Sequence, residues 1–218
     1  ELDREWAEKM HEQRVRPYSQ YLLVKEGKPY WRLAALTEEA FCHILQPMMR
    51  KGSLFLEQKG YEVGLGDFHM VKQDSFQGLE ERFWTGTDKV HHIDMEFLTS
   101  ASFKKNGEYM IFPELPLVFN NLIRKWNVYS DSMILGEERL GDKLAESMCI
   151  TDYRLHTHPF SVEGRRIRAF RGNIRLGLFK DDITRRMASM LAAFADYAGI
   201  GIKTAMGMGA VHLDIAYY

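Results

Sequence analysis

The alternation of hydrophobic and polar positions divides the chain into two halves with the same order of predicted elements. In the first half, a Glu-Gly-Lys-Pro turn connects two short strands. The next stretch has the spacing of a helix that begins after its N-cap Thr37 and stops at Gly52. The predicted order is strand, strand, helix and strand, at residues 19–27, 28–36, 37–52 and 53–58.

This order makes up four of the six elements of a ferredoxin-like βαββαβ unit. Residues 1–13 have the pattern expected for the end of the first helix of such a unit, and its opening strand is absent from the sequence. Because the sequence also lacks an initial methionine, we expect it to begin inside the first domain.

The second half repeats the order in full. Apolar residues recur at helical spacing in residues 115–129 and 181–198, and Asp181 or Asp182 is the predicted N-cap of the second helix. Gly199 lies where the C-cap of that helix is expected. Strands are predicted at residues 90–99, 150–162, 165–179 and 205–218.

The sequence therefore predicts an α+β fold of two tandem ferredoxin-like domains. Residues 1–88 form the predicted N-terminal domain, and residues 89–218 form the C-terminal domain, which carries a glycine-rich loop. A length of 218 residues suits one large domain or two small ones, and no low-complexity linker separates the halves.

Composition excludes several classes of protein. With 45% hydrophobic and 27% charged residues, the chain has an ordinary globular composition. No apolar run approaches the roughly 18 residues of a transmembrane helix, and the first residues are charged where a signal peptide would be apolar. We therefore expect a cytoplasmic protein without membrane contact. Cys42 and Cys149 lie far apart in apolar contexts, so we expect buried free thiols.

Basic residues are concentrated in one part of the second half. The formal net charge of the chain is -1, but the stretch from the first to the last of six arginines contains a single acid, Glu163. Such segregation is typical of polyanion binding, and the arginine fork fits phosphate. A solvated strand edge that prevents aggregation is the alternative. The six are Arg154, Arg165, Arg166, Arg168, Arg171 and Arg175.

Four glycines surround a Lys-Thr pair near the end of the chain, at Gly199, Gly201, Gly207 and Gly209. A Walker loop needs glycine directly before lysine and must follow a strand, whereas here Ile202 precedes the lysine and the loop follows a helix. Dinucleotide binding fails for the same reason. Two interpretations stay open: a helix cap with a strand bulge and no ligand, or a loop that closely approaches a polyanion, with Lys203 contributing charge.

The glycine-rich ending FADYAGIGIKTAMGMGAVHL, with YRLHTHPFSVEGRRIRAFRGNIRL before it, resembles the carboxyl signature of the RAMP-superfamily endoribonucleases that process precursor crRNA, the Cas6 family. EKMHEQRVRPYS is similar to the histidine segment of that family. MEFLTSASFKKNGEYMIFPELPLVFNNLIRKW resembles its conserved strand and following helix, although Thr99-Ser100-Ala101 replaces the usual Thr-Pro-Thr. These stretches occur in the family order, and the greatest similarity is to members of type III systems.

The resemblance implies a metal-independent endoribonuclease without a cofactor, which cleaves CRISPR repeat RNA by attack of a 2′-OH on the neighbouring phosphate. It implies His11 as the acid or base, because imidazole titrates near neutrality. Arg16 is the candidate cation for the transition state, with Arg14 as a competitor. The family's tyrosine and lysine roles have no clear match in this sequence.

The RNA-binding residues implied are the first five arginines of the basic stretch, the four loop glycines and Lys203. The implied partners are the precursor crRNA repeat and, transiently, a type III effector complex, with the protein as a monomer or homodimer. The alternative is a non-catalytic RNA-binding subunit of a CRISPR ribonucleoprotein. His156 and His158 have no third ligand for zinc, so we expect RNA contact or a capped strand end.

Overall fold

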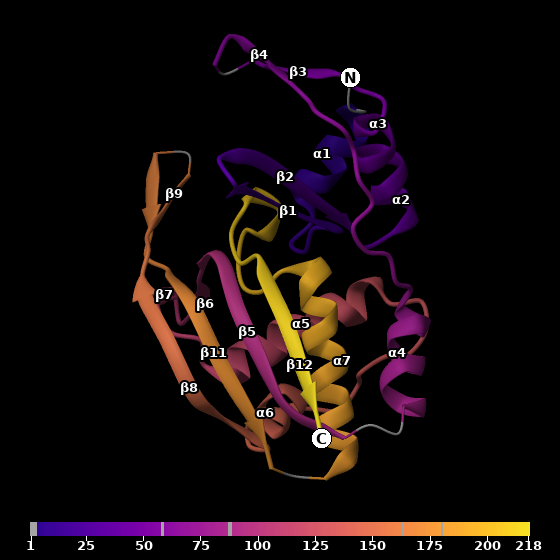
Figure 1. Cartoon of the computed structure of the whole chain (residues 1–218), viewed down its shortest axis with the longest axis vertical. Helices are drawn as coiled ribbons and strands as arrows, with labels where there is room; N and C mark the ends of the chain where they lie inside the picture. The colour runs from indigo at the N-terminus through magenta and orange to yellow at the C-terminus, as the bar shows by residue number, and fades with distance from the viewer. Residues whose placement is uncertain (1–3, 58, 87–88, 163, 180) are drawn as a thin grey trace.

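The computed structural model describes residues 4–57, 59–86, 89–162, 164–179 and 181–218, and the side chains of Arg4, Glu5, Ala7 and His11 lie outside that description. The C-terminal half is built around one antiparallel sheet of four strands in the order β12-β5-β11-β8 (Figure 1). These strands are β5 (Val90–Ala101), β8 (Met148–Thr157), β11 (Phe170–Leu178) and β12 (Val211–Tyr217).

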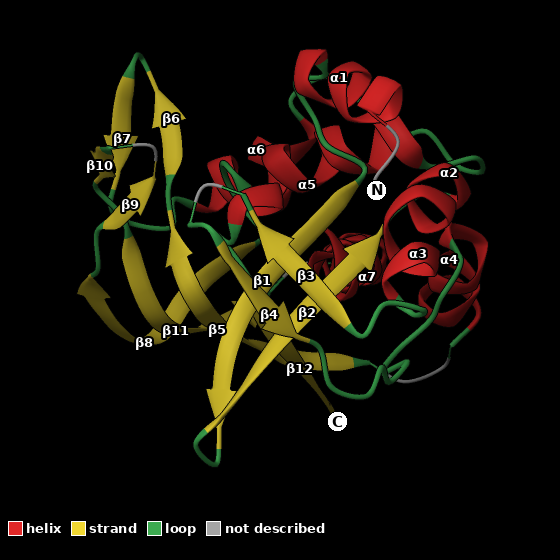
Figure 2. Cartoon of the chain, turned by 90° about the horizontal axis from the view of Figure 1, so that it is seen from above, coloured by secondary structure: helices red, strands yellow, loops and turns green. Residues whose placement is uncertain are grey.

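Two long helices, α5 (Leu115–Tyr129) and α7 (Asp182–Ala198), cover one face of this sheet (Figure 2). The chain order β5-α5-β8-β11-α7-β12 with this strand order is the complete ferredoxin-like topology predicted for the second half. α5 has the predicted bounds, and Asp181 caps α7 by accepting from the N–H of Thr184 at 2.9 Å.

Aromatic side chains fill the space between the helices and the sheet. Trp126 is fully buried, and the rings of Phe76 and Phe194 meet it edge-on, with centroid distances of 5.0 and 5.3 Å. Phe76 belongs to α4 (Phe76–Thr85), which packs against α7. Burial of such rings supplies much of the driving force for folding.

Smaller elements border the C-terminal sheet. The hairpin β9–β10 extends from the end of β8 beside the hairpin β6–β7, and one short helix follows α5 (Figures 1 and 2). The bounds are β6 (Phe103–Lys105), β7 (Glu108–Met110), α6 (Leu140–Ala145), β9 (Phe160–Val162), β10 (Arg165–Ile167) and the 3₁₀ turn η2 (Thr204–Met206).

The N-terminal half shows the predicted strand, strand, helix, strand order, preceded by helix α1 (Arg4–Glu12). The predicted N-cap is confirmed, because Thr37 Oγ1 accepts from the N–H of Ala40 at 3.1 Å. The elements are β1 (Tyr18–Lys25), β2 (Lys28–Ala35), α2 (Glu38–Ala40), the π-helix η1 (Phe41–Leu45), α3 (Gln46–Met48), β3 (Ser53–Leu56) and β4 (Tyr61–Gly64).

The described strands of this half pair as two hairpins, β1 with β2 and β3 with β4. In a ferredoxin-like sheet the second and third strands are neighbours, as β1 and β2 are here, and the fourth strand pairs with the first. Within the described residues, β3 pairs with β4. A second, smaller core joins α1 to η1 and the first hairpin, through Trp6, Met10, Ala40, Ile44 and Leu45.

The expected burial of the two thiols is wrong, although both are free: Cys42 and Cys149 are exposed. In η1 the buried positions are Ile44 and Leu45, which leaves Cys42 on the outer side. Cys149 follows buried Met148 on the edge strand β8, and alternation turns it to the other face.

The boundary near residue 88 falls at residues outside the described ranges and stays a prediction. Leu79 and Phe83 of α4 belong to the larger core, together with residues of the C-terminal sheet. None of the helices in the described ranges combines the length and the apolar character needed to cross a bilayer.

Candidate nucleic-acid interface

The glycine-rich loop, residues 199–210, returns the chain from α7 to the sheet. Gly199 ends the helix at φ +63° with its N–H donating to Ala195 O at 2.8 Å. The N–H of Ile200 donates to Gly209 O at 2.8 Å, and the N–H of Gly209 donates to Ser100 O at 2.9 Å. β12 begins at Val211 and not at residue 205 as predicted, because η2 and two glycines with positive φ occupy the intervening positions.

Three of the four glycines allow the loop to pack on the protein's own backbone. A Cβ added to Gly201 would lie 2.3 Å from Ser102 O, and one added to Gly209 would lie 1.9 Å from Ile200 O. A Cβ on Gly199 would meet the Thr204 methyl at 2.9 Å. The helix-cap interpretation therefore explains these three positions, whereas Gly207, with nothing nearer than Phe160 at 3.9 Å, has room beside it.

Two side chains of α5 hold the loop from inside the protein. Asn121 Oδ1 accepts from the N–H of Gly201 at 2.9 Å. Lys125 Nζ donates to Ala198 O at 2.9 Å, to Gly199 O at 2.8 Å and to Thr204 Oγ1 at 3.3 Å. Sequence reasoning missed both residues, because a lysine next to Arg124 at helical spacing gives no sign of which side chain is buried.

The basic hairpin β9–β10 packs against this loop. Ile167 and Ala169 form a small buried core with Met208 of the loop, and Phe160 packs against it. Arg165 and Arg166 are exposed on this hairpin. Two predicted parts of the RNA-binding surface, distant in sequence, are therefore adjacent in the structure.

The remaining predicted arginines occupy different environments. Arg171 lies across from His156, and Arg154 lies across from Asn173, so these side chains share the face of the sheet opposite the helices. Arg168 is exposed, but its guanidinium pairs with Glu108 at 3.0 Å.

The open face of the sheet is divided by charge. Arg154, His156 and Arg171 lie on β8 and β11 together with one acid, Asp152, which lies across from Arg175. β5 and β12 present three carboxylates, with Glu96 across from His212 and Asp94 across from Asp214. The sixth arginine of the basic stretch, Arg175, lies at the boundary and binds Asp94. A polyanion is therefore favoured on the β8–β11 side and disfavoured on the β5–β12 side.

A serine and a histidine connect the loop to the end of β8. Ser100 Oγ lies 2.7 Å from His158 Nδ1, and Ser100 O is the acceptor for Gly209. The N–H of His158 also donates to Ala169 O at 2.9 Å. His158 is thus an exposed imidazole in a fixed position, which agrees with the capped strand end expected from the sequence.

His11 lies within α1, but its side chain is outside the described residues, so its catalytic role stays a prediction. Arg16 follows α1, is half-buried and donates to Gln13 O. Burial raises the pKa of Tyr129 to about 12, and the charge of Arg16 opposes this shift, which places Arg16 near the end of α5. The Tyr129 hydroxyl donates to Val15 O at 2.5 Å.

Two residues at the start of β1 contact the end of α7 and the glycine-rich loop. Ser19 Oγ donates to Tyr197 O at 2.5 Å, and Gln20 Nε2 donates to Ala205 O at 2.6 Å. The segment that follows α1 is therefore bonded to the end of α7 and to η2. Burial raises the pKa of Tyr18 in this segment, since its ring packs against the smaller core.

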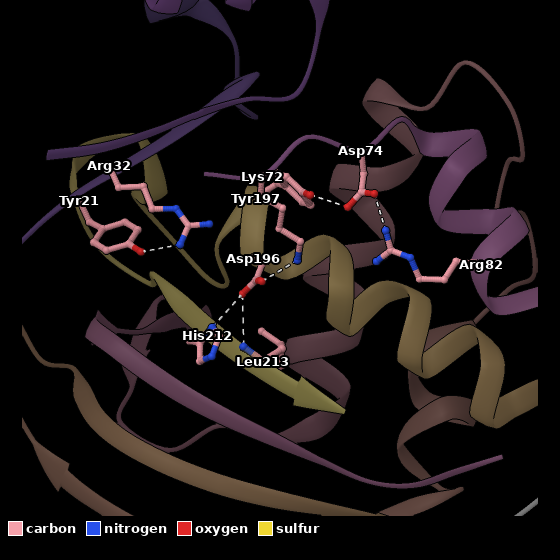
Figure 3. Close-up of polar contacts among 9 residues, drawn as sticks. All are labelled: Tyr21, Arg32, Lys72, Asp74, Arg82, Asp196, Tyr197, His212 and Leu213. Carbon is pink, nitrogen blue, oxygen red and sulfur yellow. Dashed lines mark hydrogen bonds and ion pairs between the residues drawn. The ribbon is translucent and has the colours of Figure 1, made fainter. Parts of the chain in front are cut away.

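A polar network fixes the segment between β4 and α4 to the end of α7 (Figure 3). The nearly buried Asp196 accepts from Lys72 Nζ at 2.9 Å and from the N–H of Leu213 at 3.2 Å. The Tyr197 hydroxyl donates to Asp74 at 2.5 Å, and burial raises the pKa of Tyr197. These contacts join residues 72 and 74 to the last turn of α7, directly before the glycine-rich loop.

Comparisons with known proteins agree on one family. The family model described as CRISPR-associated endoribonuclease Cas6 matches residues 95–211. The CRISPR-associated endoribonuclease Cas6 of Streptococcus thermophilus is 28% identical over 98% of this chain and 87% of its own length. That of Mycobacterium tuberculosis is 28% identical over 96% of this chain and 67% of its own length.

Solved structures are similar over nearly the whole chain. A Cas6 product complex covers 98% of this chain and 88% of its own, with a TM-score of 0.82 and 21% identity. A Thermus thermophilus Cas6 covers 98% of this chain and 85% of its own, with a TM-score of 0.69 and 20% identity. These similarities confirm the predicted fold class, α+β with tandem ferredoxin-like domains.

Proposed function

Because the chain belongs to the Cas6 family of CRISPR-associated endoribonucleases, we propose that it cleaves the repeat of precursor crRNA without a metal ion. The ribose 2′-OH loses its proton to a base and attacks the adjacent phosphorus. The new O2′–P bond forms as the P–O5′ bond breaks, and an acid protonates the leaving O5′. The products are a 2′,3′-cyclic phosphate and a 5′-OH.

The observation that carries this proposal is the packing of the arginine hairpin on the glycine-rich loop. Ile167 and Ala169 meet Met208 in a buried contact, so Arg165, Arg166 and Lys203 belong to one continuous region. Arg154 and Arg171 extend the basic side chains along β8 and β11. Arginine and lysine side chains neutralise the phosphates of the RNA backbone, and sequence-specific recognition of RNA mostly targets single-stranded regions.

His11 is the proposed proton-transfer residue and Arg16 the proposed cation for the transition state. Val15, next to Arg16, accepts a hydrogen bond from Tyr129 of α5. Gln20 of β1 donates to Ala205 of η2, so the residues that follow α1 contact the glycine-rich loop. An imidazole near neutrality can serve as base or acid, and such proton transfer contributes about 10² to 10⁴-fold to the rate. Arg14 is exposed and is the alternative cation.

Among the four glycines, we assign Gly207 to RNA contact. Gly199, Gly201 and Gly209 support the loop, since the space beside each is filled by the protein itself. Arg168 contributes less than Arg165 and Arg166, because Glu108 offsets its charge. Transfer of the product to a type III effector complex completes the proposed role.

The test is cleavage of labelled repeat RNA in excess EDTA, with and without a 2′-deoxy sugar at the cut position. We expect cleavage in EDTA, no cleavage of the deoxy substrate, and a cyclic phosphate end. His11→Ala should slow cleavage at least 10²-fold with RNA binding retained, whereas Glu12→Ala, the exposed neighbour in α1, should cleave normally. Cleavage that needs metal, or that tolerates the deoxy sugar, overturns the mechanism. Tight binding without any cleavage identifies a non-catalytic subunit instead.

A further inference from the structure

Lys125 is a buried cation below the glycine-rich loop. It is 4% exposed and lies on α5 beside the fully buried Leu122 and Trp126. Its ammonium has three protons, and it donates to three uncharged acceptors, Ala198 O, Gly199 O and the hydroxyl of Thr204. A buried ammonium is costly unless each proton has a partner, and here each one does.

The first two acceptors lie at the carboxyl end of α7. The last carbonyls of a helix have no partner within the helix, and they form the negative end of its dipole. A lysine from another helix supplies both the donors and the opposite charge at this point. Its third bond reaches Thr204, five residues beyond Gly199, so one side chain joins the helix end to η2.

The residue between these anchors is Lys203. It adopts the left-handed region at φ +55°, which is unfavourable for a residue with a side chain. Asn121 holds Gly201 before it, and Lys125 holds Thr204 after it. The strained backbone of Lys203 is thus fixed on both sides by residues of α5.

We propose that Lys125 is a positioning residue for RNA binding, which fixes the glycine-rich loop so that Lys203 and the open side of Gly207 stay in the geometry that receives the RNA backbone. The proposal rests on the proposed function. It assigns Lys125 no contact with RNA, because its ammonium is directed into the protein. Lys125 affects RNA affinity only by fixing the conformation of the glycine-rich loop.

The charge of Lys125 depends on pH near neutrality. Burial, together with the charge of the exposed Arg124 on the same helix, lowers its pKa to about 7. The groups that face it from α7 and η2 are carbonyls and a hydroxyl, and the nearby Asp196 and Tyr197 are bonded to Lys72 and Asp74 instead. A neutral amine has two protons for three acceptors, so the loop should loosen as pH rises above about 7.

The experiment measures binding of a 2′-deoxy repeat RNA, which is not cleaved, at pH 6.5 and 8.5. For Lys125→Met we expect about a tenfold loss of affinity at pH 6.5, which corresponds to about 1.4 kcal/mol. The affinity of Lys125→Met should also fall less between the two pH values than that of the wild type. Val128→Ala, at an exposed position of the same helix, should retain the wild-type pH response. Wild-type affinity of Lys125→Met at pH 6.5, or an unchanged pH response, overturns the proposal.

A milder variant covers the case in which Lys125→Met does not fold. Thr204→Val removes one acceptor and keeps the volume, and it should weaken binding in a way that is not additive with Lys203→Met. Additive losses of affinity from Thr204→Val and Lys203→Met would contradict the proposal that both residues act through one loop conformation. The double variant Arg165→Gln/Arg166→Gln separates the two proposals. If it leaves RNA binding intact, the proposed RNA interface is wrong. If it abolishes RNA binding while the loop variants do not weaken it, only the positioning role of Lys125 is wrong.

Discussion

Arg175 and Asp94 form a two-pronged ion pair across strands β11 and β5, with Nε at 2.7 Å from Oδ1 and Nη2 at 2.9 Å from Oδ2. The hydrogen bonds of Arg175 lower the pKa of Asp94, so the carboxylate is held in its charged form. The pair lies where the basic and acidic halves of the open sheet face meet. Like Arg168 with Glu108, Arg175 therefore already has an acidic partner within the protein.

The first prediction concerns this pair. Replacing both partners, as Arg175→Gln with Asp94→Asn, leaves the net charge of the face unchanged, so the salt dependence of RNA binding should not change. Arg165→Gln/Arg166→Gln should lower the slope of log K against log salt by roughly 1.4, since each lost contact with single-stranded RNA removes about 0.7. The measurement is a filter-binding titration at several salt concentrations. Equal slopes for the two double variants would contradict the assignment.

The second prediction separates the glycines. Gly209→Ala should destabilise the protein strongly, because its new methyl would meet Ile200 O at 1.9 Å while the backbone stays at positive φ. Gly207→Ala has open space and should cost about 1 to 2 kcal/mol for its left-handed backbone alone. Urea unfolding at neutral pH measures both. A Gly207→Ala variant less stable than Gly209→Ala would show that the loop has a different conformation.

The third prediction follows from the lowered pKa of Lys125, about 7 in the folded protein. An unfolded lysine titrates near 10.4, so between these values the unfolded state binds more protons. The free energy of unfolding should therefore rise with pH, by up to about 1.4 kcal/mol per pH unit from this residue. Below pH 7 the full cost of burying the charge is present, and it is relieved as pH increases toward 10.

The control for that experiment is Lys125→Met, which lacks the titrating group. Other ionisable residues contribute equally to both proteins, so the difference between the two unfolding curves isolates Lys125. The difference should change steadily between pH 7 and 10 and should be constant below pH 6. A difference that does not depend on pH would mean that the ammonium stays charged throughout.

The pattern of the sequence predicted the main sheet and the two long helices of the second half, but it was wrong to join β8 with β9 and β10 with β11, which the structure separates at residues 158–159 and 168–169. Apolar residues at helical spacing fixed α5 at Leu115–Tyr129, and the βαββαβ order implied the observed sheet. The start of β12 was predicted six residues too early, because alternating small and apolar residues also suit a strand. The strand cannot begin earlier because Gly209 packs against the backbone of Ile200. Local periodicity does not predict such a tertiary contact.

The candidate interface was predictable in its residue types but not in its electrostatics. The acids that bind Arg168 and Arg175 are Glu108 and Asp94, which lie 60 and 81 positions away in sequence. A count of charges within one stretch cannot include them. Likewise, Lys125 and Arg124 are neighbours of the same charge, and only the packing of α5 on α7 decides that the first is buried.

The most direct test compares binding and single-turnover cleavage of repeat RNA for two variants. His11→Ala should bind RNA with nearly wild-type affinity and cleave it at least 10²-fold more slowly, because only proton transfer is lost. Arg165→Gln/Arg166→Gln should bind more weakly but cleave at nearly the wild-type rate when RNA is saturating, because the chemistry is intact. If His11→Ala cleaves normally, or if the arginine variant binds normally, one RNA does not span the basic surface and the α1 histidine, and the account is wrong.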